Sequence, residues 1–65
     1  MNEKLATIWE VYERDGSSCA LYLDEKDAKA CDVFPNGYDK ISKSTIYVSI
    51  GDLALLEAGI PVIIT

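Results

Sequence analysis

Hydrophobic and polar residues alternate along the first part of the chain, and this alternation predicts two paired strands. Residues 5–13 (LATIWEVYE) are rich in β-forming residues and place Trp9 on one face and Ile8 on the other. Asp15-Gly16 follows, a dipeptide typical of hairpin turns because both residues tolerate positive φ. Residues 18–23 (SCALYL) form the second, antiparallel strand, and its expected core face consists of Cys19, Leu21 and Leu23.

A short helix is expected directly after this hairpin, over residues 25–32. Asp24 stands at the N-cap position, and Asp27 lies where a capping box carries its carboxylate. The acidic side chains at this end also suit the positive end of the helix dipole. The helix offers Ala28 and Cys31 to the core, and the turn signal PNG at residues 35–37 ends the unit.

The second half of the chain predicts a strand, a helix and a final strand. Alternation over residues 38–50 is strongest from Thr45 onward, whereas the polar start of this segment indicates a bulged strand or a loop. Ser49 can cap a helix over residues 52–58, which Gly59 ends in the left-handed conformation, with Ile60 reaching back to Leu55. Residues 61–65 (PVIIT) form the last strand. Residues 1–65 are thus one α+β domain of order β-β-α-β-α-β, an antiparallel hairpin-based sheet packed by two short helices.

The C-terminal segment holds more apolar side chains than two short elements can turn toward one sheet. We therefore expect part of it to form a homo-oligomer interface. The residues expected there are Leu53, Leu56, Ile60, Val62, Ile63 and Ile64. The alternative is that the continuously apolar residues 62–64 are a central strand of the chain's own sheet, covered on both faces.

The small size of the chain favours the same expectation. A domain of 65 residues buries about 60% of the surface that its unfolded form exposes, and such domains often rely on disulfides, metals or oligomerisation. With no histidine and only Cys19 and Cys31, the chain alone cannot supply four zinc ligands. We expect free, buried thiols; a disulfide, a redox pair or a zinc site shared across a dimer are the alternatives. The N-terminal residues lack an export signal, which favours the cytoplasm.

Charge is unevenly distributed along the chain, whose net charge is −5. Residues 1–39 carry nine acidic and four basic side chains, a balance of −5, while residues 40–65 carry two of each. This acidity argues against binding to nucleic acid or an anionic membrane, and no apolar run reaches the roughly 18 residues of a membrane span. The acidic surface either keeps a small domain in solution, imitates nucleic acid, or meets a basic patch on another protein.

The residue types of catalytic sites are scarce. There is no histidine, and no nucleotide-binding, hydrolase or metalloprotease motif occurs. The carboxylates near Asp24 are explained by helix capping, and they lack the glycine and glutamate of a calcium loop. We expect a protein that is not an enzyme, with no cofactor and no metal.

Aromatic and basic residues are instead typical of a binding site. Large amphipathic rings suit stacking and interfaces, and the segment KISKST combines two cations with three hydroxyls that can hold a phosphate. The predicted ligand-binding residues are Trp9, Tyr12, Lys40, Lys43, Ser44, Thr45 and Tyr47. The alternatives are that the rings belong to the core and that the lysines protect a solvated strand edge.

Residues 9–28 (WEVYERDGSSCALYLDEKDA) resemble the hairpin-then-helix opening of short accessory proteins from bacteriophages and prophages. This resemblance implies a role in countering host defence from within the host cytoplasm. One hypothesis is a homo-oligomer that sequesters a nucleotide-like signalling ligand. A second is an acidic, anti-CRISPR-like inhibitor of a basic host protein, and a third is a structural interaction module. The acidic residues of the second hypothesis are Glu10, Glu13, Asp15, Asp24, Glu25 and Asp27.

Overall fold

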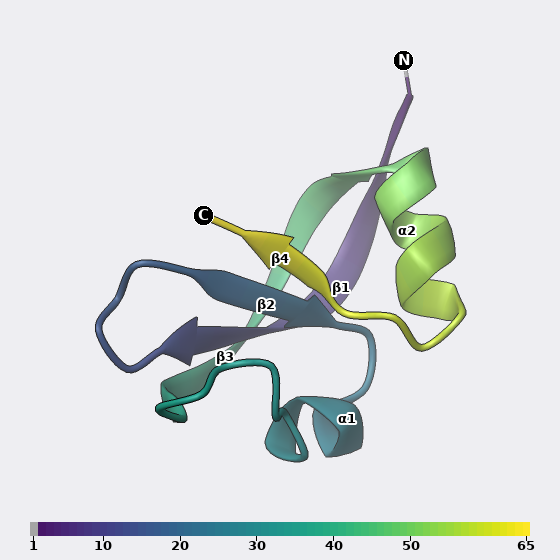
Figure 1. Cartoon of the computed structure of the whole chain (residues 1–65). Coiled ribbons are helices and arrows are strands. Elements are labelled where there is room, and N and C mark those ends of the chain that lie inside the picture. The colour runs from purple at the N-terminus through teal and green to yellow at the C-terminus, as the bar shows by residue number, and fades with distance from the viewer. Residues whose placement is uncertain (1) are drawn as a thin grey trace.

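Four antiparallel strands and two short helices make up the fold of residues 2–65, which the computed structural model describes. The sheet has the strand order β3-β1-β2-β4, and the predicted element order is confirmed (Figure 1). Neither helix in this part of the chain has the length and apolar character that a membrane span requires. The elements are β1 (Glu3–Glu13), β2 (Cys19–Tyr22), α1 (Glu25–Lys29), β3 (Tyr38–Ser49), α2 (Ile50–Glu57) and β4 (Val62–Ile64).

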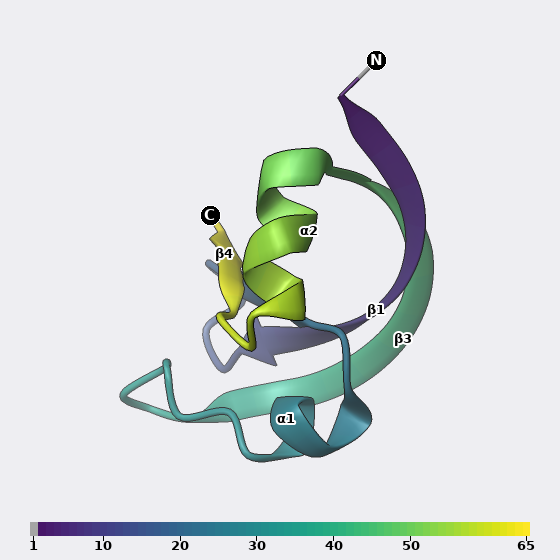
Figure 2. The ribbon, with the colours of Figure 1, turned by 90° about the vertical axis from the view of Figure 1, so that its right-hand side faces the viewer.

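The two longest strands, β1 and β3, are neighbours in the sheet. They pair from Glu3 opposite Ser49 to Glu13 opposite Tyr38, with a register shift between Tyr12 and Glu13. Asp39 has no partner at this shift, so the polar segment before Thr45 is the start of a bulged strand, one of the two predicted possibilities, and is not a loop. The pairing with β1 compensates for its weak alternation. Both strands curve strongly, and Figure 2 shows α2 lying inside the curve.

The two helices cover opposite faces of the sheet at different places. We call the face that α2 covers the concave face, and the opposite face, against which α1 packs, the convex face (Figure 2). The concave cluster contains Ile8, Leu21, Val48 and Leu56; the convex cluster contains Val11, Ala20, Tyr22, Ala28 and Phe34. The expected single core face of β2 was thus incomplete, because Ala20 and Tyr22 are buried on its other face.

The helices and strands begin and end largely at the local sequence signals predicted for them. Gly16, at the hairpin, and Gly59, after α2, have φ of 77° and 82°, a region that favours glycine. The Ser49 side chain accepts a hydrogen bond from the Asp52 N–H, and the Ile60 N–H donates to the Leu55 carbonyl. Asp24 occupies the N-cap position of α1, but its side chain makes no capping hydrogen bond. α1 also ends at Lys29 instead of Asp32.

The final strand β4 lies at an edge of the sheet and pairs only with β2. The alternative of a central, doubly covered strand was wrong, because Ile63 and Ile64 are both exposed and no strand follows on the outer side within residues 2–65. Among the residues expected at an oligomer interface, Leu56 is buried and Leu53 packs against the same concave cluster. Val62 packs against this cluster as well. These three belong to the core of the chain itself, which leaves Ile60, Ile63 and Ile64 as the exposed members of the set.

Candidate binding surface

The sheet divides the seven predicted ligand-binding residues between its two faces. Successive side chains of a strand point to opposite faces, and the contacts of the two clusters assign each position. The convex face carries Trp9, Lys43, Thr45 and Tyr47, whereas the concave face carries Tyr12, Lys40 and Ser44. A single site in one protomer therefore cannot contain all seven.

Three cross-strand pairs continue the convex face beyond the part that α1 covers. Leu5 lies opposite Tyr47, Thr7 opposite Thr45 and Trp9 opposite Lys43. We call these six residues the convex platform. They stand in three successive rows because they occupy alternate positions of two long paired strands.

Two rows of the platform, the middle row of Thr7 and Thr45 and the lower row of Trp9 and Lys43, are held by contacts between their side chains. The Thr7 and Thr45 Oγ1 atoms are 3.1 Å apart, within hydrogen-bond distance. The Lys43 Nζ lies 5.6 Å from the centre of the Trp9 ring, a cation–π contact that holds the ammonium over the face of the indole. Trp9 is half-buried against the convex cluster, so this end of the platform is anchored in the core.

The upper row, formed by Leu5 and Tyr47, is open to solvent. Tyr47 is 68% exposed and Leu5 is 54% exposed, although they are neighbours on adjacent strands. Neither belongs to the two core clusters. A large aromatic and a large aliphatic side chain that stay together at the surface of so small a domain are typical of an interaction site.

Two concave residues of the predicted set contact each other, and the third contacts a carboxylate. The Ser44 hydroxyl donates a hydrogen bond to the Glu10 carboxylate at 2.7 Å, and the Lys40 Nζ lies 5.0 Å from the centre of the Tyr12 ring. Burial, and then the nearby Glu10 carboxylate, raise the pKa of Tyr12. A carboxylate among these groups opposes the binding of a phosphate, so this part of the predicted set lacks the electrostatics of an anion site.

The two lysines of the predicted phosphate site point to opposite faces of β3. Lys43 stands over Trp9 on the convex face, and Lys40 stands over Tyr12 on the concave face. Each face thus presents one of the two ammonium groups. Phosphate recognition by both lysines would require two protomers, one for each face.

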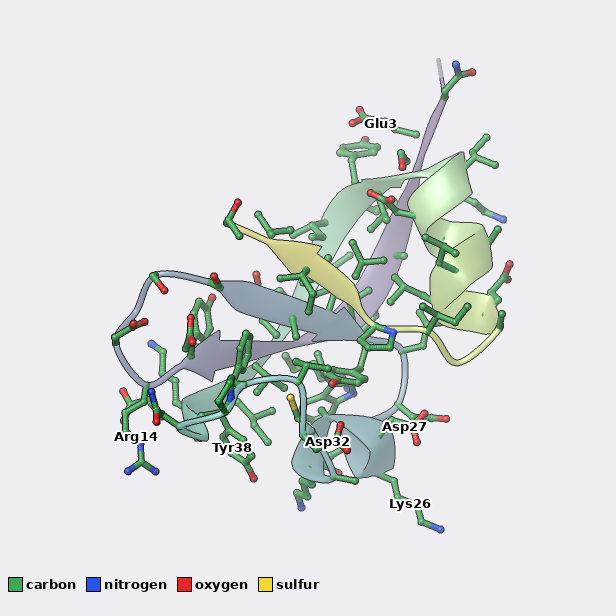
Figure 3. The ribbon with its side chains drawn as sticks, in the orientation of Figure 1. Glu3, Arg14, Lys26, Asp27, Asp32 and Tyr38 are labelled. Carbon is green, nitrogen blue, oxygen red and sulfur yellow. The ribbon has the colours of Figure 1, made fainter. Side chains whose placement is uncertain are left out.

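The acidic residues of the inhibitor hypothesis lie in separate places. Glu13 ends β1 and Asp15 lies in the turn that follows, whereas Asp24, Glu25 and Asp27 lie at the start of α1, beyond the other end of β2. Glu10 lies apart from both groups, on the concave face, where its carboxylate accepts a hydrogen bond from Ser44. Figure 3 shows the same separation for labelled residues, with Arg14 at the hairpin and Asp27 on α1. Two smaller acidic groups, and not one continuous acidic face, result from this arrangement.

The two cysteines lie on opposite sides of the sheet, and both are free thiols. Cys19 packs against the concave cluster and Cys31 against the convex cluster. The sheet between them prevents a disulfide within the folded chain. Burial, and then the Glu10 carboxylate, raise the pKa of the Cys19 thiol, which keeps it protonated and poorly nucleophilic near neutral pH.

Tyr22 is the most buried aromatic residue of the two inner strands, β1 and β2. It is 8% exposed and belongs to the convex cluster. Burial raises its pKa above the usual range of tyrosine, and the neighbouring Cys31 adds to this effect. Its hydroxyl therefore stays protonated near neutral pH.

Leu5 and Thr7 are platform residues that the sequence reasoning missed. Their pairing with Tyr47 and Thr45 depends on the register of β1 and β3, and it joins residues that are more than thirty positions apart in the chain. The alternation of residues 5–13 contained part of this signal, since it places Leu5, Thr7 and Trp9 on one face. The alternation of β1 alone did not show which residues of β3 lie opposite Leu5 and Thr7.

No family model matches the chain, and neither a curated protein nor a solved structure matches it. Within residues 2–65, no group of three or more histidine, cysteine, aspartate or glutamate side chains is placed to hold a metal ion. A hollow at the hairpin is lined by Glu13, Arg14, Asp15 and Asn36, and it contains none of the predicted ligand-binding residues.

Proposed function

We propose that this chain is a non-catalytic binding protein that docks onto a partner protein through the convex platform. The observation that carries the proposal is the exposed pair Leu5 and Tyr47, which continues a row of side chains from the half-buried Trp9. The proposed place of action is the cytoplasm.

The shape and chemistry of the platform favour a macromolecular partner. Six side chains on two paired strands form a broad surface, and none of them lines the hollow at the hairpin. Small ligands bind in concavities that enclose most of their surface, whereas proteins bind to broad surfaces with aromatic anchors. Tyr and Trp are also the residues that most often dominate the binding energy of such interfaces.

Charge on the platform differs from the charge of the whole chain. Lys43 is the charged side chain among its six residues, in a chain of net charge −5. A partner surface that offers an apolar pocket for Tyr47 and a carboxylate near Lys43 fits this pattern. The carboxylate would meet an ammonium already positioned by the Trp9 ring.

The nucleotide-like ligand is a second candidate because Lys43, Thr45 and Tyr47 stand in line on one face of β3. An ammonium, a hydroxyl and an exposed ring in this order can meet a phosphate and a base. The open face encloses little of such a ligand, so this candidate also needs a second wall from another protein chain. A role in countering host defence would suit either kind of stoichiometric binder.

The double variant Leu5→Ala with Tyr47→Ala tests the proposal. Truncation of a hot-spot pair costs at least about 2 kcal/mol, so we expect the affinity for the partner to fall about thirtyfold or more. The measurement is quantitative recovery of co-purifying proteins from source cells by the tagged wild type and the tagged variant.

The matched control is Ile50→Ala with Leu55→Ala, which removes two exposed apolar side chains from α2. The control should recover the same partner as the wild type. Equal recovery by the platform variant would contradict the proposal. A small molecule released from the wild type on denaturation, without a protein partner, would favour the second candidate.

A further inference from the structure

The outer edge of β4 is an unpaired strand edge without charged side chains. Residues 58–65 contain no ionisable side chain, and Ile60, Ile63 and Ile64 are each between 44% and 50% exposed. The opposite edge strand, β3, carries Asp39, Lys40 and Lys43 instead. Charged side chains, lysine especially, protect strand edges from pairing with other chains, and β4 lacks this protection.

The backbone of Ile63 faces the open edge. The Glu13 N–H donates to the Ser18 carbonyl, which directs the backbone groups of Ser18 toward β1. Alternation along β2 then directs those of Cys19 and Leu21 toward β4, opposite Ile64 and Val62. The N–H and carbonyl of Ile63 consequently point away from β2. The backbone of Pro61 points the same way, so its missing N–H costs no hydrogen bond with β2.

We infer that this edge pairs with β4 of a second copy of the chain, antiparallel, around a two-fold axis at Ile63. The two Ile63 residues then exchange N–H to carbonyl hydrogen bonds, and the sheet continues over eight strands. On the convex face each Ile63 lies opposite its equivalent. On the concave face each Val62 lies opposite Ile64 of the second copy, so every side-chain pair in the contact is apolar.

Charge and symmetry favour a second copy as the occupant of this edge. Two chains of net charge −5 repel each other over most of their surfaces, yet the segment from residue 58 to residue 65 brings no charged side chain to the contact. A two-fold contact also requires a surface that is complementary to itself, and a short apolar strand centred on Ile63 fulfils this condition. Since β4 has three residues, the buried area belongs to the class of small, reversible interfaces below about 1,200 Å².

A charge-swap experiment tests the register as well as the dimer. Ile63→Lys places two ammonium groups opposite each other at the axis, and Ile63→Glu does the same with two carboxylates. We expect the wild type to sediment at twice 7.2 kDa and each variant alone as a monomer. An equimolar mixture of the two variants should form a heterodimer, because the two chains then carry opposite charges at the axis.

Ile50→Lys is the matched control, since it charges an isoleucine of similar exposure on α2 and should leave the dimer intact. The platform variant Leu5→Ala with Tyr47→Ala should also remain dimeric, which separates this inference from the proposed function. Circular dichroism establishes that each variant is folded. A wild type that is monomeric at about 1 mM, where a dimer with a Kd of about 1 mM would be substantially populated, overturns the inference. So does a dimer that both Ile63 variants retain, or a mixture of folded variants that stays monomeric.

Discussion

Ile8→Ala should lower the free energy of unfolding by about 2–5 kcal/mol, the range for deleting a large aliphatic side chain from a core. Ile8 is fully buried at the centre of the concave cluster, where strands β1, β2 and β3 meet α2. Domains have about 0.05–0.15 kcal/mol of stability per residue, so a chain of this size has roughly 3–10 kcal/mol in total. The substitution therefore removes a large part of the stability, and we expect the melting temperature to fall by more than about 10 °C.

Thermal and urea unfolding followed by circular dichroism measure this effect. Ile50→Ala is the control, because Ile50 is the same residue type but is 55% exposed, and exposed substitutions usually change stability by less than about 0.5 kcal/mol. Equal losses for the two variants would show that the concave cluster does not hold α2 against the sheet.

Phe34→Ala should lower the free energy of unfolding by about 3–5 kcal/mol, the usual cost of truncating a buried aromatic residue. Phe34 is 8% exposed and packs with Val11, Tyr22 and Ala28 in the convex cluster. α1 has five residues, too few for a stable helix in isolation, so it depends on this packing. We therefore expect residues 24–37 to lose amide protection first in hydrogen exchange.

Val33→Ala is the matched control, since it truncates the neighbouring side chain of the same loop, which is 37% exposed. It should cost much less than Phe34→Ala. A Phe34→Ala variant with unchanged stability and unchanged protection of α1 would contradict the assignment of Phe34 to a second core.

Local signals explain why much of this fold follows from the sequence. The turn at Asp15-Gly16, the cap at Ser49 and the stop at Gly59 each depend on residues a few positions apart, and the structure confirms all three. The contact of Ile60 with Leu55 is of the same local kind. Such features need no knowledge of the tertiary structure, because the interacting groups are neighbours in the chain.

The errors concern contacts between distant parts of the chain. The weak alternation at the start of β3 left a bulged strand and a loop open, and only the pairing with β1, which shifts register between Tyr12 and Glu13, decides for the bulged strand. The apolar residues 62–64 suggested a covered strand, yet the sheet order places β4 at an edge. Burial on both faces of β2 depends on two helices that lie on opposite sides, which no local pattern of β2 encodes.

The candidate site shows the same limit. Residue types along β1 and β3 indicated a binding surface, but residues that are close in sequence do not all lie close in space. Lys40 and Lys43 are three positions apart on a strand and therefore point to opposite faces. Leu5 and Tyr47 are far apart in sequence and lie side by side.

Site-specific photocross-linking in source cells tests the central claim most directly, namely that the convex platform is the surface that meets a partner. One variant carries a photoreactive residue in place of Tyr47, and the control carries it in place of Ile50, a comparably accessible position outside the platform. We expect a discrete protein adduct from position 47 on irradiation and none from position 50. Adducts from position 50 alone, or the absence of any protein adduct from position 47, would contradict the account.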